Sequence, residues 1–145
     1  MISITARLDL NIEPGDLLAQ YGLERGGRVQ KVIDEKVIEY SDPYTPASPF
    51  RGLAKSPKIA TEIGSGFVIW DTEYARYQYY GFVMTDELGR TWVRYGEKKP
   101  IVTDRPLTYD TSQNPLAGSH WFERMKADRL NDILDEARRA MLQGE

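Results

Sequence analysis

The chain has 145 residues, of which 41% are hydrophobic and 28% are charged, and this composition is typical of one globular domain. The formal net charge is -3, which argues against binding to bulk duplex DNA, because such binding depends on a basic surface. The sequence contains no cysteine, which excludes disulfides and thiolate metal sites. It shows neither a basic stretch followed by an apolar run at its start nor a run of ~18 apolar residues, so we expect no secretory signal and no membrane span.

The first predicted elements are a strand or arm over residues 1–13 and a long helix over residues 14–42. Apolar and polar residues alternate in ISITARLDL, which is the period of a half-buried strand. Pro14 suits the first turn of a helix, and apolar residues then recur at spacings of three and four. The glycine pair at 26–27 predicts either a kink or a break, because each glycine costs ~1 kcal/mol inside a helix. Pro43 is expected to end the helix.

Residues 43–117 are predicted to form a small sheet with one short helix and long loops. The proline-rich stretch over 43–58 predicts an irregular loop. Two hairpins are expected after it, one turning at GSG and the other at DELGR. The strands expected in these two hairpins are Ile59–Ile63 with Phe67–Trp70, and Phe82–Met84 with Thr91–Tyr95.

A short helix is expected between the hairpins, over Glu73–Tyr80. Asp71-Thr72 is the type of sequence that caps a helix N-terminus, and Gly81 is the type of residue that ends one. Residues 97–119 are expected to form a long irregular connection, and loops of this length in compact domains are often functional. Such a segment needs water or a neighbouring subunit to satisfy its backbone polar groups.

The last predicted element is a helix over residues 118–143, with Ser119 as its N-cap. Its expected apolar face consists of Trp121, Phe122, Met125, Leu130, Ile133, Leu134, Ala137 and Met141. The order of strand, helix, strands and helix predicts a single α+β domain, in which a small antiparallel sheet packs against two long helices.

Candidate catalytic groups are sparse, and we expect neither catalysis nor a cofactor nor a metal site. His120 is the only histidine, so a zinc site would consist mostly of carboxylates, which is unusual. His120 beside Ser119 is a weak candidate for a general base, because a lone histidine in a first helical turn is more often a polar end-group. The acid pairs Asp71/Glu73 and Asp86/Glu87 are the kind of adjacent carboxylates that ordinary surface turns carry.

The stretch DTEYARYQYYGF at residues 71–82, here named the tyrosine segment, concentrates aromatic residues in one place. Its tyrosines spread around a helix axis at ~100° per residue, so they need partners on several sides. Three interpretations compete: core packing, a platform for single-stranded nucleic acid that uses Arg76 with Lys98 and Lys99, and a surface that another protein covers. The acidic neighbours of the segment disfavour the nucleic-acid platform, and we favour a protein–protein surface.

The tyrosine segment also carries a family resemblance. The runs IGSGFVIWDTEYARYQYYGFVM and NPLAGSHWFERMKAD resemble the minor capsid protein family of tailed bacteriophages, whose members are similar to neck, or tail-completion, components. The shared features, in chain order, are a long N-terminal helix, Tyr44 and Pro46, Gly52, Leu53 and Ser56, Trp70, Tyr74 through Gly81, and Trp121 through Glu123. The resemblance spans about residues 14 to 140, and it departs at 46–52, where relatives often have a shorter threonine-glycine turn.

The resemblance implies a structural virion protein without catalysis, made in the host bacterial cytoplasm. Copies are expected to form a ring, sixfold by this resemblance, in the connector between head and tail, next to head-completion and tail proteins. DNA is expected to pass through the ring without sequence-specific binding, since an acidic surface repels phosphates. The residues expected at the subunit or neck interface are Trp70, Tyr77, Tyr79, Tyr80, Trp121 and Phe122. The alternative function is a single-stranded nucleic-acid-binding module that uses the Tyr/Arg cluster at 74–80.

Overall fold

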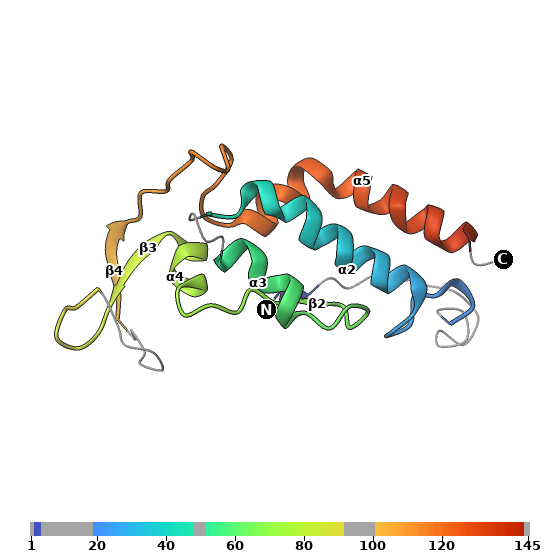
Figure 1. The fold of residues 1–145 in the computed structure, drawn as a ribbon, viewed down its shortest axis with the longest axis horizontal. Helices are drawn as coiled ribbons and strands as arrows, with labels where there is room; N and C mark the ends of the chain where they lie inside the picture. The colour runs from blue at the N-terminus through green and yellow to red at the C-terminus, as the bar shows by residue number, and fades with distance from the viewer. Residues whose placement is uncertain (1, 4–18, 48–51, 92–100, 144–145) are drawn as a thin grey trace.

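The computed structural model describes residues 2–3, 19–47, 52–91 and 101–143. It is a single α+β domain, as the sequence predicts, and two long helices dominate it: α2 (Arg28–Ser41) and α5 (Trp121–Gln143). The two helices lie side by side and antiparallel (Figure 1). Their facing apolar side chains form the core together with residues from the intervening segments. The burial of this shared surface is the main stabilising contribution of the fold.

The glycine pair at 26–27 marks a break, which is one of the two outcomes that the sequence left open for the helix predicted over 14–42. Helical geometry is present at 19–21, a loop follows, and α2 begins only at Arg28; residues 14–18 lie outside the described residues. Gly26 has φ 79°, a left-handed conformation that favours glycine. A Cβ atom at Gly27 would lie 2.4 Å from the carbonyl oxygen of Gly22, so the tight loop also requires glycine there.

A third helix, α3 (Gly52–Ala60), occupies a stretch that was expected to be loop and strand. The loop prediction over 43–58 and the strand prediction Ile59–Ile63 are therefore wrong for the residues that form this helix. Pro57 lies inside α3 and has no N–H to donate to the carbonyl of Leu53. The Ser56 hydroxyl donates to that carbonyl instead, at 2.8 Å. This replacement hydrogen bond explains how the helix accommodates the proline.

The strand β2 (Phe67–Val68) pairs antiparallel with β1 (Ile2–Ser3) and not with residues 59–63. The predicted turn at 64–66 exists, and Gly64 (φ 99°) and Gly66 (φ 81°) adopt left-handed conformations in it. Asp34 of α2 holds the turn in place. One of its carboxyl oxygens accepts the N–H groups of Gly64 at 2.7 Å and Gly66 at 3.1 Å.

The second hairpin forms with a different partner strand. β3 (Phe82–Thr85) pairs antiparallel with β4 (Ile101–Pro106), and Met84 lies opposite Val102. β4 falls in the connection that was expected to be irregular, so that prediction is wrong for residues 101–106. Most of the predicted partner strand, residues 92–95, lies outside the described residues. The two-stranded ribbon extends away from the paired helices at one end of the molecule (Figure 1).

α5 follows the prediction closely, with two corrections. It begins at Trp121, directly after His120, so Ser119 does not take the predicted cap position. Leu130 and Leu134, which were expected on the apolar face, are exposed, whereas Ala140 is buried. The buried face therefore covers a narrower arc of the helix than the sequence pattern indicated. A short 3₁₀ helix, η1 (Asp42–Tyr44), follows α2 at the predicted helix end and contacts α5.

Substitution of Asp34 tests the link between α2 and the glycine turn. Asp34 is 1% exposed, so Asp34→Ala leaves the two glycine N–H groups without their acceptor in a buried place. We expect the free energy of unfolding to fall by about 3 kcal/mol, measured by chemical denaturation. The matched control is Glu35→Ala, an exposed carboxyl group on the next residue, which should change stability by less than about 0.5 kcal/mol. Equal effects of the two substitutions would contradict the assigned role of Asp34.

Candidate functional site

The six predicted interface residues divide into a buried group and a tyrosine group. Trp70, Trp121 and Phe122 belong to the core of the chain, and Trp121 is only 1% exposed. Tyr77 and Tyr79 are half-buried, while Tyr80 is 55% exposed. The three buried residues already have packing partners within the chain. The predicted contact with another chain therefore applies chiefly to the three tyrosines.

The tyrosines lie on the short helix α4 (Ala75–Tyr80). Ala75 faces the core, and Gly81 ends the helix in a left-handed conformation (φ 86°) with its N–H on the carbonyl of Tyr77. This ending is the one that the sequence predicts. The predicted cap is wrong, because Tyr74 takes the N-cap position and makes no side-chain capping bond.

Aromatic edges fix α4 to the N-terminus of α5. The ring of Tyr79 meets that of Trp121 perpendicularly, with ring centroids 4.6 Å apart. Trp121 in turn presents an edge to Trp70, with centroids 5.8 Å apart. Such edge-to-face pairs contribute about 0.5–1.5 kcal/mol each beyond their buried area. The tyrosine segment is therefore half core: its inner side is anchored, and its outer side presents rings to solvent.

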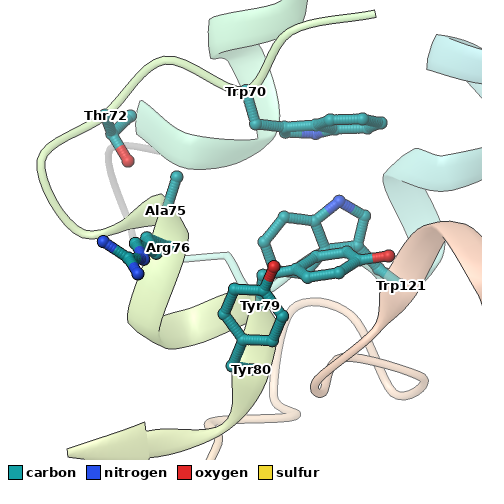
Figure 2. Close-up of a pocket in the computed structure, with 7 residues that line it drawn as sticks. All are labelled: Trp70, Thr72, Ala75, Arg76, Tyr79, Tyr80 and Trp121. Atoms are coloured by element: carbon teal, nitrogen blue, oxygen red, sulfur yellow. The ribbon is translucent and has the colours of Figure 1, made fainter. Parts of the chain in front are cut away.

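A cavity of about 370 Å³ opens beside this anchor, and we name it the aromatic pocket. Figure 2 shows Trp70 on one side of it, Tyr79, Tyr80 and Trp121 on the other, and Thr72 and Arg76 at its flank. The residues that line the pocket are Trp70, Thr72, Ala75, Arg76, Tyr79, Tyr80 and Trp121. The aromatic members of the pocket were visible in the sequence but the pocket was not, since Trp121 is distant in the chain from the other lining residues, which all lie within 70–80.

The aromatic pocket contains polar groups without partners. The Thr72 hydroxyl, the Tyr79 hydroxyl and the indole N–H of Trp121 are buried and have no hydrogen-bond partner among the described residues. In Figure 2 the indole nitrogen of Trp121 lies on the edge that faces Trp70. All three groups can donate, and Arg76 adds an exposed cation at the rim. The accessible lining of the pocket is therefore largely aromatic, with one cation at its rim.

His120 connects α4 to α5 through its backbone. Its N–H donates to the carbonyl of Tyr79 at 2.8 Å, and its φ of 49° turns the chain into α5. The imidazole lies beside the rings of Tyr79 and Tyr80, at centroid distances of 5.2 and 6.0 Å. Among the described residues, no group of three or more histidine or acidic side chains is placed to hold a metal ion. The absence of catalysis stays a prediction.

The nucleic-acid alternative rests on residues that the structure places only in part. Arg76 and Tyr80 are exposed near each other at the aromatic pocket, while Lys98 and Lys99 lie outside the described residues. The exposed acids Asp71 and Glu73 flank the same segment. Carboxylates at this position oppose the approach of phosphates, which favours a protein partner over a nucleic acid.

One residue that holds the segment in place escaped the sequence analysis. The Tyr109 hydroxyl donates to the carbonyl of Gln78 at 2.5 Å, and Leu107 N–H donates to the carbonyl of Gly81. These bonds fasten the end of α4 to the chain that follows β4. No local pattern in the sequence indicated that Tyr109 reaches α4.

Comparisons with protein-family models, with curated proteins and with solved structures give no match to this chain. Within the described part of the chain, no helix combines the length and the apolar character that crossing a membrane requires.

Alkaline titration tests the packing of Tyr77. Burial, with a smaller contribution from the charge of Tyr74, raises the pKa of Tyr77 to about 12. Because the neutral phenol is favoured in the folded chain, its stabilising effect is complete below the ordinary pKa of 10.0 and is lost as the pH rises toward 12. The wild type should thus lose stability relative to Tyr77→Phe over this interval.

The same substitution gives a direct optical check. The ultraviolet titration curve of Tyr77→Phe should lack one tyrosinate signal that the wild type shows near pH 12. A missing signal near pH 10 instead would mean that Tyr77 is solvated and that the packing described for α4 is incorrect.

Proposed function

We propose that this chain is a structural virion protein of a tailed bacteriophage, which forms part of the head–tail connector ring and has no catalytic role. One observation carries the proposal: the tyrosine segment, which bears the family resemblance, is also the place where large rings are left exposed. Tyr74, Tyr80 and the adjacent Phe82 are exposed on or next to α4. An aromatic side chain that stays exposed on an anchored helix is typical of surfaces that bind another protein.

The anchoring of α4 supports this role. Tyr79 is fixed against Trp121, so the exposed Tyr80 is presented from a rigid support rather than from a mobile loop. A pre-positioned ring loses little conformational entropy when a partner covers it, and tyrosine has few rotatable bonds. In the proposed ring, each copy contacts its two neighbours through two different faces. Such contacts form a closed ring when a whole number of copies completes one full rotation.

The remaining partners follow from the proposed position in the particle. The ring, sixfold by the resemblance, would contact head-completion and tail proteins on its two sides. DNA would pass through it without sequence-specific binding, and the net charge of -3 supports passage without adhesion. Assembly would take place in the bacterial cytoplasm, where virions are built.

Gene disruption tests the proposal in the phage that encodes the chain. Particles made without it should be DNA-filled heads and free tails that do not join, as seen by negative-stain electron microscopy. A plasmid copy of the wild type should restore plaques, whereas Tyr80→Arg should restore them poorly because it places a cation in the covered aromatic surface. Tyr21→Arg is the matched control, since Tyr21 is an exposed tyrosine outside the tyrosine segment.

Two results would contradict the proposal. One is normal joining of heads to tails without the gene. The other is salt-sensitive micromolar binding of short single-stranded DNA, measured by fluorescence anisotropy and lost in Arg76→Ala. This result would favour the nucleic-acid alternative.

A further inference from the structure

The turn at residues 86–90, here named the hairpin tip, is held in one shape by a single side chain. One oxygen of Asp86 accepts the N–H groups of Leu88 at 3.0 Å and Arg90 at 2.8 Å, and the other oxygen accepts from the Arg90 guanidinium. The Asp86 N–H closes the turn on the carbonyl of Arg90. Burial alone would raise the pKa of Asp86, but the hydrogen bonds from Arg90 and Leu88 lower it.

This well-ordered turn presents an apolar side chain to solvent. Leu88 is 79% exposed, and the acidic Glu87 beside it is exposed as well. A leucine on a fixed turn offers apolar surface that a partner can bury at a small cost in chain entropy. The hairpin tip lies at the end of the ribbon remote from α4 (Figure 1).

The aromatic pocket matches the hairpin tip in two respects. Its aromatic walls suit an apolar side chain such as that of Leu88. Arg76 at the rim is the opposite charge to Glu87, and no ion pair holds Arg76 among the described residues.

We propose that the hairpin tip of one copy docks into the aromatic pocket of another copy, with Leu88 in the pocket and Glu87 beside Arg76. The two surfaces are different, so the contact is heterologous and leaves one tip and one pocket free for further copies. The inference rests on the proposed function, because it identifies the surfaces through which copies in the ring join.

The test is sedimentation of the full chain at increasing concentration, which yields an association constant for each variant. Leu88→Asp should lower that constant at least about tenfold, because it removes the apolar group from a desolvated contact. Arg76→Glu should lower it several-fold through repulsion of Glu87, and the double variant Arg76→Glu/Glu87→Arg should restore it. Ile59→Asp is the control, since Ile59 is an equally exposed apolar residue on α3.

The inference is contradicted if the wild type stays monomeric at the highest concentration reached, or if Leu88→Asp leaves the association unchanged. It is also contradicted if Ile59→Asp abolishes the association, or if the double variant fails to restore it. Gene disruption tests the neck function separately. If heads and tails fail to join without the gene but the charge reversal fails, the neck function is supported and this contact is contradicted. If heads and tails join without the gene but the charge reversal succeeds, the contact is supported and the neck function is contradicted.

Discussion

The packing of Trp121 between Trp70 and Tyr79 is the interaction on which the rest of the structure depends. Trp121 is the first residue of α5 and is almost fully buried. Its ring meets Tyr79 from α4 on one side and Trp70 from the segment after β2 on the other. Two parts of the chain that are far apart in sequence, residues 70–79 and the start of α5, thus meet at one indole. This contact joins α4 to the helix pair through side chains, and the hydrogen bond from His120 N–H to the Tyr79 carbonyl joins it through the backbone.

The anchored and exposed sides of the tyrosine segment have a common origin. A six-residue helix cannot bury rings that spread around its axis, so some of them remain at the surface when Ala75 and Tyr79 face the core. The same geometry creates the aromatic pocket, since Tyr80 and Arg76 stand beside the anchor and not over it. The structure therefore combines a rigid support, an aromatic cleft and an adjacent cation in one place, which is the arrangement that protein contacts commonly use.

Local signals in the sequence predicted much of the fold. Gly81 ended α4 as expected, and the spacing of apolar residues identified α5. The failures came from interactions that no local pattern contains. Pro57 reads as a helix breaker, yet the Ser56 hydroxyl replaces the lost backbone donor within α3. The pairing of β2 with β1, and of β3 with β4, brings together residues that are distant in the chain.

The aromatic members of the candidate site were visible in the sequence, but their division into core and surface was not. The sequence predicts both Trp70 and Tyr80 as interface residues, but tertiary packing buries Trp70 and leaves Tyr80 exposed to solvent. Thr72 was expected to cap a helix, and instead it is one of the residues of the aromatic pocket and its hydroxyl is buried without a partner among the described residues. A pocket depends on how distant segments meet, so only the folded arrangement reveals it.

We propose that exposed rings of the tyrosine segment are covered when the chain is assembled into a virion. Residue-resolved chemical labelling of tyrosine, compared between the isolated chain and assembled virions, tests this claim most directly. Tyr80 should be labelled readily in the isolated chain, because it is 55% exposed, and should be strongly protected in the virion. Equal labelling of Tyr80 in both states would contradict the account.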